Sequence, residues 1–224
     1  MTKVTVLLYT LTYRGIGGWE RYVQNLVKYL PDNCVDVVLI DTPCSKFVTQ
    51  YAHCIKGVFS VPLEPVSRPA IYVDYLSMWL RSFSQRRTSS ILHIPSQIDL
   101  HLIKLIRAER YVVTIHGFSF LLLGGSAQLK AKLLDKAIRY VDVVITVSNW
   151  TKSFIRHYLR LPERKIVVVY HCVDRSVFNE VRTELDDIML SKLGLASKLY
   201  FLHVSSGNPL KNPKIILDAA EMLE

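Results

Sequence analysis

Three glycines separate a predicted strand from a predicted helix near the start of the chain, and this turn is where we expect chemistry. They are Gly15, Gly17 and Gly18. Glycine allows positive φ angles and lets a ligand approach the backbone without meeting a Cβ atom. The helix that follows presents free N–H groups and the positive end of its dipole, which together suit a phosphate or a carboxylate. The turn therefore predicts a site for an anionic ligand, and a tight turn without any ligand is the alternative.

The same turn raises the question of a dinucleotide cofactor. The fingerprint G-x-G-x-x-G would need a third glycine at position 20, where this chain has Glu20. Asp41 lies near the end of the second predicted strand, and an acidic residue about 20 positions past the turn is what dinucleotide-binding folds use to hold a ribose. A dinucleotide-dependent enzyme therefore stays as one alternative interpretation.

The elements that position these residues alternate between strand and helix from residue 3 to about residue 170. Short apolar runs rich in β-branched residues predict strands buried on both faces, and apolar residues at three- and four-residue steps predict helices. This alternation is typical of an α/β fold with a doubly wound sheet of parallel strands. The predicted strands are 4–8, 35–42, 57–61, 91–94, 111–115, 141–147 and 165–170, and the predicted helices are 19–30, 45–53, 70–83, 99–110, 126–140 and 149–161.

Ligands of such folds bind beyond the carboxyl ends of the strands, which selects a few loops of this chain. Tyr13 lies in the first of these loops, and a second loop spans 95–97. His116 follows another strand and precedes Gly117, so it can offer a hydrogen bond near neutral pH, with a satisfied loop histidine as the alternative. Ser148 is predicted to be the N-cap of the next helix, whose N-terminus then faces the crevice.

Bulk composition excludes several classes of protein. The 224 residues are 50% hydrophobic and 21% charged, which favours a folded core over disorder. No apolar run reaches the roughly 18 to 20 residues that cross a bilayer, and the start, MTKVTV, lacks the regions of a signal peptide. The four cysteines form no C-x-x-C pair and have no histidine at zinc-like spacing, so no metal or redox motif is indicated and a cytoplasmic location fits.

The net charge of +9 suits a phosphorylated substrate, an anionic membrane surface or nucleic acid. The basic residues are scattered over several predicted helices without any nucleic-acid motif, so no nucleic-acid partner is expected. One aromatic and basic segment is the best candidate for peripheral contact with an anionic membrane, and a plain solvated helix end is the alternative. That segment contains Trp79, Arg81, Phe83, Arg86 and Arg87.

Five segments in order resemble the retaining glycosyltransferases of family 4, which have the two-domain GT-B architecture. They are GIGGWERYVQNLVKYL, TIHG at 114–117, VDVVITVSNWTKSFI at 141–155, KIVVVYHCVDRSVF at 165–178 and YFLHVSSGNPLKNPKIILDAAEML at 200–223. The resemblance implies an acceptor-binding Rossmann-like domain over 1–175. It also implies a linker and the beginning of a truncated, nucleotide-sugar-binding Rossmann-like domain over 176–224, whose first strand would be 198–204. The family usually has Asn-Gly where this chain has His171 and Cys172.

The resemblance also implies an activity and a set of site residues. The activity is transfer of a sugar from a UDP- or GDP-sugar to a lipid, glycan or protein acceptor, with retention of configuration and without a metal or cofactor. His116 would contact the reaction centre, and Glu20 would orient an acceptor, unless it only complements the helix dipole. The donor phosphates would be held by Gly17, Gly18, Lys211 and Asn212, while Ser206 stands where the family has a phosphate-binding arginine.

Length sets the last expectation. A complete second domain would need roughly another 150 residues, and the family's later acidic motif is not found in this sequence. We expect a fragment, a naturally short member or one half of an assembly, and a non-catalytic or partner-dependent binding subunit is the second interpretation. An isolated βα unit leaves a sheet edge and apolar surface uncovered, so residues 198–224 are predicted to pack against the first domain or against a second copy of the chain.

Overall fold

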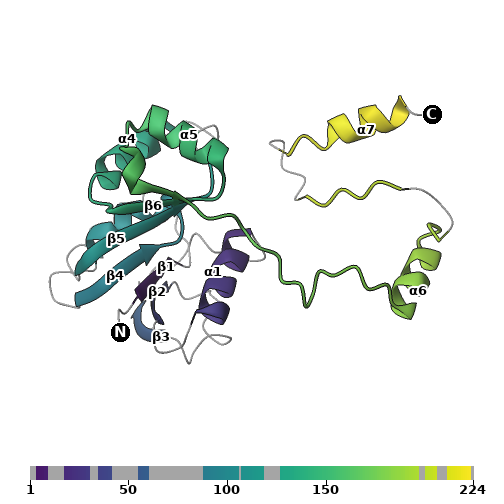
Figure 1. Cartoon of the computed structure of the whole chain (residues 1–224), viewed down its shortest axis with the longest axis horizontal. Helices are drawn as coiled ribbons and strands as arrows, with labels where there is room; N and C mark the ends of the chain where they lie inside the picture. The colour runs from purple at the N-terminus through teal and green to yellow at the C-terminus, as the bar shows by residue number, and fades with distance from the viewer. Residues whose placement is uncertain are drawn as a thin grey trace. The chain divides into compact units, whose positions relative to one another are not determined.

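The computed structural model describes the chain in two compact units, Met1–His171 and Cys172–Glu224 (Figure 1). The predicted domain boundary, after residue 175, lies a few residues past this division. The described residues are 4–9, 18–30, 35–41, 55–60, 88–105, 107–118, 127–196, 200–205 and 211–222. The predicted helices at 45–53 and 70–83 lie outside these ranges, as does the aromatic and basic segment from Trp79 to Arg87.

A parallel sheet forms the centre of the first unit. Its strands are β1 (Val4–Tyr9), β2 (Val35–Asp41), β3 (Ile55–Ser60), β4 (Thr88–Ile94), β5 (Arg107–Ile115), β6 (Val143–Thr146) and β7 (Ile166–Val168). They pair in the order β3-β2-β1-β4-β5-β6-β7, and every neighbouring pair is parallel. The order reverses between β1 and β4, so the predicted doubly wound sheet is confirmed. A crevice is expected at that reversal, beyond the carboxyl ends of the strands.

Helices connect these strands by crossovers. They are α1 (Gly18–Tyr29), the 3-10 helix η3 (Gln97–Leu105), α4 (Ala127–Ile138), α5 (Asn149–Tyr158) and the short 3-10 helix η4 (Glu163–Lys165). Right-handed crossovers on either side of the reversal place α1 on one face of the sheet and α4 and α5 on the other. In Figure 1, α4 and α5 lie together near β6, while α1 lies beside β1 and β2.

The main core lies on the face covered by η3, α4 and α5. Side chains alternate between the two faces of a strand, so every second residue of β4 and β5 contributes to this core. The buried core residues are Leu92, Ile94, Leu100, Ile103, Val113, Ile115, Phe118, Leu134, Ala137, Ile138, Val141, Val144, Ile155, Leu159 and Ile166. The residues between them on β4 and β5 therefore face α1, where Val6 and Val23 are also buried.

One predicted helix is wrong. The segment 99–110 was expected to be helical, but η3 ends at Leu105 and β5 begins at Arg107, where it pairs with Thr88 of β4. The apolar spacing that suggested an α-helix also fits a 3-10 helix, because residues three apart eclipse one another there. Leu100 and Ile103 are the buried pair at that spacing.

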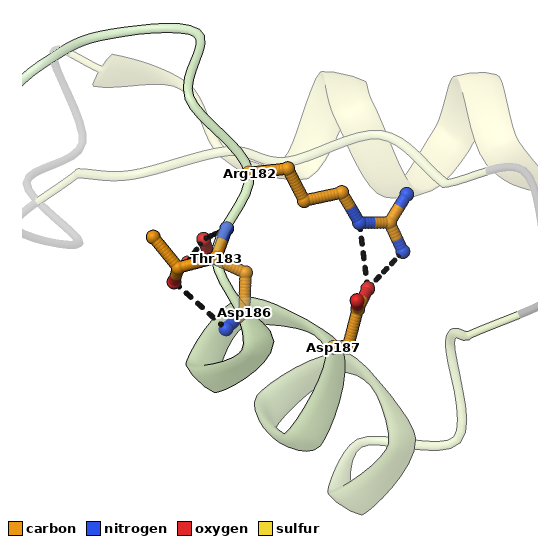
Figure 2. A network of polar contacts seen from close by, with 4 residues as sticks. All are labelled: Arg182, Thr183, Asp186 and Asp187. Carbon is orange, nitrogen blue, oxygen red and sulfur yellow. Dashed lines mark hydrogen bonds and ion pairs between the residues drawn. The ribbon is translucent and has the colours of Figure 1, made fainter.

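The second unit contains two described helices, α6 (Glu184–Lys192) and α7 (Lys214–Glu221). Figure 2 shows how the sequence starts α6: Thr183 accepts a hydrogen bond from Asp186 N, and the Asp186 carboxylate accepts one from Thr183 N at 2.7 Å. This reciprocal capping box satisfies two backbone donors that the helix start leaves unpaired. Arg182 Nε donates to Asp187 at 2.6 Å beside it.

The strand predicted at 198–204 is not formed at residues 200–204. A strand exists only when its backbone pairs with another strand, and within 172–196, 200–205 and 211–222 the second unit contains none. Phe201, Leu202 and Val204 are exposed there. Packing of residues 198–224 against the first unit or against a second copy stays a prediction. Among all described helices, none is long and apolar enough to cross a membrane.

Candidate functional site

Polar side chains gather on the face of the sheet that α1 covers. His93 lies between two core residues of β4, and Thr114 lies between two core residues of β5, so both side chains turn away from the main core toward α1. His93 Nε2 lies 2.9 Å from Thr114 Oγ1, and Tyr22 Oη from α1 lies 2.9 Å from the same oxygen. These atoms form a hydrogen-bonded chain that runs from β4 through β5 to α1.

Burial determines the protonation states of His93 and Tyr22 in this hydrogen-bonded chain. His93 is 5% exposed, and its desolvation, followed by repulsion from His116, lowers its pKa to about 4. Burial raises the pKa of Tyr22, and its hydrogen bond with Thr114 opposes that shift. Both groups are therefore neutral near pH 7.

His116 follows β5 directly and is held from two sides. Its backbone N donates to Gln97 Oε1 at 3.1 Å, and Gln97 Nε2 donates to Gly117 O at 2.8 Å, which ties the start of η3 to the end of β5. His116 Nε2 lies 2.8 Å from Pro95 O. A carbonyl oxygen only accepts, so His116 Nε2 carries a proton and donates it. Burial lowers the pKa of His116, the bond to Pro95 opposes that shift, and His171 lowers the pKa further.

His171, the last residue of the first unit, completes the site. Its Nε2 lies 3.3 Å from His116 Nδ1, and the two rings stack with centroids 5.3 Å apart and planes 17° apart. The ring of Tyr22 meets both imidazoles edge-on, at centroid distances of 4.9 Å to His116 and 5.3 Å to His171. Partial burial lowers the pKa of His171. We call His116 and His171 the histidine pair.

Sequence reasoning selected His116 and the 95–97 loop but missed three residues of this site. By its spacing in the sequence Tyr22 belongs to the apolar stripe of the first helix, and His171 stands out only as a departure from the family pattern. His93 sits inside the apolar run ILHI. A histidine within a buried strand is a polar residue in an apolar setting, and this pattern could have indicated the site.

The predicted residues at the other strand ends have varied outcomes. Gly18 begins α1 and is exposed, and a Cβ added there would meet nothing within 4 Å. Gly18 does not have a positive φ, so its backbone conformation does not require glycine. What glycine provides at this position is open space beside the backbone. Ser148 is the N-cap of α5, as predicted, because its Oγ accepts from Thr151 N at 3.1 Å. Glu20 lies in the first turn of α1. Tyr13, Gly17 and Ser206 lie outside the described residues.

Lys211 and Asn212 belong to the second unit and precede α7. Both are exposed. Asn212 has φ 43°, in the left-handed region that asparagine tolerates better than most residues. Its carbonyl accepts from Ile215 N at 3.2 Å, so the turn at Asn212 leads directly into α7. This turn leaves the Lys211 side chain in solvent, where it can meet an anion.

The chemistry available at this site is hydrogen bonding by neutral groups. The histidine pair and Tyr22 place two neutral imidazoles and a phenol in a partly dry setting, where hydrogen bonds to a polar ligand are stronger than in water. Within the described ranges, no cluster of three or more His, Cys, Asp or Glu residues could hold a metal ion.

Comparison with known proteins gives one family and one shared fold. Residues 16–177 match the model of Glycosyltransferase Family 4. No protein with a curated description matches the sequence. Three similar crystal structures are of Anabaena Alr3699/HepE. The complex with UDP has a TM-score of 0.69 at 17% identity and covers 98% of this chain and 57% of that chain. The complex with UDP and glucose has a TM-score of 0.69 at 17% identity and covers 100% of this chain and 59% of that chain. The complex with UDP-glucose has a TM-score of 0.64 at 18% identity and covers 98% of this chain and 57% of that chain. This chain thus spans less than two thirds of the structures whose fold it shares.

Proposed function

Because the chain belongs to glycosyltransferase family 4, we propose that it forms part of an enzyme that transfers a sugar from a nucleotide sugar to an acceptor. Its doubly wound first unit has the Rossmann-like fold of GT-B proteins. In this proposal the first unit binds the acceptor, and the second unit begins the part that binds the nucleotide sugar. We infer retention of anomeric configuration and independence of metal from the family, and both belong to the proposal.

The placement of His116 is the observation that carries this proposal. The residue lies at the carboxyl end of β5, where ligands of such sheets bind. Its ring is already oriented by the Pro95 carbonyl and by the edge of Tyr22. A preorganised group costs little reorganisation when charge develops in the transition state. His116 is neutral near pH 7 because burial lowers its pKa, so it would present an uncharged ring beside a sugar carbon that becomes cation-like.

The donor phosphates need backbone N–H groups and cations. Open space beside Gly18 at the start of α1 leaves room for a phosphate oxygen near the first backbone N–H groups of the helix. The resemblance assigns the mobile point charge of Lys211 to the donor phosphates as well, and Ser206 stands where the family has arginine. The related crystal structures contain UDP, UDP with glucose and UDP-glucose. UDP-glucose is therefore the first donor to test.

Thermal stability of the chain with single ligands tests the donor assignment. UDP, GDP and ADP, their common sugar conjugates and NAD would each be added at millimolar concentration. A ligand at about 100 times its dissociation constant stabilises the folded state by about 2.7 kcal/mol, which is visible as a rise in melting temperature. We expect a selective rise with one nucleotide sugar.

Two substitutions and one control make this assay specific. Gly18→Ala should leave the unliganded melting temperature almost unchanged, because the new methyl group meets no atom within 4 Å, yet it should weaken the nucleotide shift. Lys211→Ala should weaken the shift as well. Lys192→Ala removes an exposed lysine at the end of α6 and should not alter it. A shift that survives both Gly18→Ala and Lys211→Ala would contradict this donor site.

Two other functions keep an observation in their favour. Asp41 ends β2, the neighbour of β1, which is where a dinucleotide-binding fold holds a ribose. Stabilisation by NAD in preference to every nucleotide sugar would support that function. A binding subunit that needs a partner chain is the other function, and Ser206 in place of the family's phosphate-binding arginine favours it. Binding of a nucleotide sugar without hydrolysis or transfer would support the binding subunit.

The acceptor, the cellular location and the assembly complete the proposal. The acceptor is a lipid, a glycan or a protein, and the location proposed from the sequence is cytoplasmic. Peripheral contact with an anionic membrane and a homo-oligomer that covers 198–224 are proposed from the sequence. Sedimentation with anionic vesicles and analytical ultracentrifugation would test them.

A further inference from the structure

The hydrogen bonds of the histidine pair fix where its protons lie. His116 Nε2 donates to the Pro95 carbonyl, so in neutral His116 the other ring nitrogen, Nδ1, carries no proton and accepts. The atom 3.3 Å from that nitrogen is His171 Nε2. It must therefore be the donor, which places the proton of neutral His171 on Nε2 as well. The remaining ring nitrogen, His171 Nδ1, is then an acceptor.

The two imidazoles differ in how they can take up one more proton. A proton on His116 Nδ1 would remove the acceptor of the bond from His171, and His171 would have to move its own proton to Nδ1. A proton on His171 Nδ1 breaks neither bond, because Nε2 of His171 still donates to His116. His171 is also the exposed member of the pair, whereas His116 is half-buried. A charge on His171 therefore costs less desolvation than a charge on His116.

We propose that His171 is a positioning residue that takes the proton of the histidine pair at its Nδ1 atom, so that His116 stays neutral and keeps its orientation. The pair thus takes up one additional proton, and the resulting positive charge lies on the ring of His171 and not on that of His116. This proposal rests on the proposed function for its meaning, since a cation on His116 would repel a cation-like sugar carbon. The displaced charge on His171 would instead lie where it can attract a diphosphate.

The groups that face the pair do not favour a charge on His116. Tyr22 from α1 presents its ring edge to both imidazoles, and burial raises the pKa of its phenol, which stays neutral. His93 from β4 has a pKa of about 4, so it is neutral where the pair titrates and offers no negative charge to His116. Gln97 at the start of η3 carries no charge. Within the part of the chain that the structure describes, His171 has no carboxylate partner.

Side-chain NMR of the uniformly ¹⁵N-labelled chain tests this proposal directly. Long-range ¹H–¹⁵N spectra distinguish protonated from unprotonated ring nitrogens. The chain contains 7 histidines, and single His→Gln variants at 93, 116 and 171 would assign the relevant signals. On acidification we expect His171 Nδ1 to become protonated first, while His116 Nδ1 remains unprotonated through the same transition. Protonation of His116 before His171 would overturn the proposal.

Two variants separate hydrogen bonding from simple packing. His171→Leu keeps a side chain of similar bulk but cannot donate, so His116 should become protonated at a pH higher by on the order of half a unit. His171→Asn restores the family residue, whose amide N–H can donate to His116 Nδ1, and should reverse much of that shift. Equal titration of His116 in both variants would mean that His171 acts only by packing, and this result would contradict the proposal. His157→Gln on the exposed face of α5 is the matched control.

A functional readout follows only if a nucleotide sugar binds. In that case the affinity for UDP-glucose should rise with acidification through the titration of His171, and His171→Leu should remove this pH dependence. Failure of every nucleotide to bind would refute the proposed function while the NMR titration still tests the proton position. An unaltered pH dependence in His171→Leu would refute the attraction of the charged His171 to the diphosphate.

Discussion

Acidification from pH 7 to pH 5 should destabilise the first unit, and the buried residue His93 should contribute most of this loss. Its imidazole is buried, and desolvation together with repulsion from His116 lowers its pKa from 6.5 to about 4. In the unfolded chain the same imidazole is solvated and returns to its ordinary pKa. Between these two values the unfolded state binds the proton and the folded state does not, so the free energy of unfolding falls as the pH falls.

The size of this effect follows from the two pKa values. The stabilisation is fully present above about pH 6.5 and is lost toward pH 4. Proton linkage predicts a loss of about 2 kcal/mol between pH 7 and pH 5, approaching about 3 kcal/mol at pH 4. The carboxylates of Asp142 and Glu163, whose pKa values are lowered by their hydrogen bonds and ion pairs, act at lower pH. The window from pH 5 to pH 7 therefore reports on histidines.

Urea unfolding at several pH values would measure this loss. His93→Gln keeps a hydrogen-bonding amide beside Thr114 but cannot take up a proton. We expect its free energy of unfolding to fall by about 2 kcal/mol less than that of the native chain between pH 7 and pH 5. The same substitution at His157, which is exposed on α5, should leave the pH dependence unchanged. Parallel pH profiles for His93→Gln and the native chain would refute the reasoning.

Three further predictions concern stability at fixed sites. Ser148→Ala should cost about 1 kcal/mol in urea unfolding because it removes the N-cap bond to Thr151 N, and Ser148→Asp, which can still accept that bond, should recover most of it. Leu92→Ala should cost about 3 kcal/mol because Leu92 is fully buried in the main core, whereas Val177→Ala, at an exposed position, should cost less than about 0.5 kcal/mol by the same measurement. Asp142→Asn should weaken the acceptor for Tyr111 N, whose hydrogen bond is the largest cause of the lowered pKa of Asp142. The stability that Asp142 contributes is present above the ordinary carboxyl pKa and is lost below it, so the variant should show less acid destabilisation below about pH 4.

The sheet could be predicted from the sequence because its strands carry a local pattern. Apolar runs such as VDVVLID of β2 fit only strands that are buried on both faces, and their regular alternation with helices left few topologies. Ser148 was predictable for the same reason, since an N-cap depends on its own helix. The segment 97–105 was not, because a three-residue apolar repeat fits both an α-helix and a 3-10 helix. Which helix forms depends on strand pairing, because Arg107 pairs with Thr88 of β4 and so begins β5.

The site was only half predictable because it is built by contacts between distant residues. His116 was found from its place after a strand, but His171 lies 55 residues further along the chain and reaches it only because β7 lies beside β6 at the edge of the sheet. Tyr22 fits the apolar stripe of α1 by spacing alone. Its hydroxyl group has a partner in Thr114, 92 residues away, and no local pattern predicts such a contact.

His93, in the buried hydrogen-bonded chain with Thr114 and Tyr22, and His171, in the histidine pair, can be replaced separately. The pH dependence of stability can therefore be distinguished from the titration of the histidine pair. Replacing His93 by glutamine should reduce the pH dependence of stability, because burial lowers the pKa of His93 to about 4 in the folded state. Above about pH 5 His93 is already neutral, so the same variant removes no charge from the surroundings of His116. The titration of the histidine pair should therefore persist in His93→Gln, while His171→Leu should alter that titration and leave the His93 part of the stability profile in place. If His93→Gln altered the titration of the histidine pair, the two groups of histidines would be coupled, and the assignment of separate roles to His93 and His171 would be wrong.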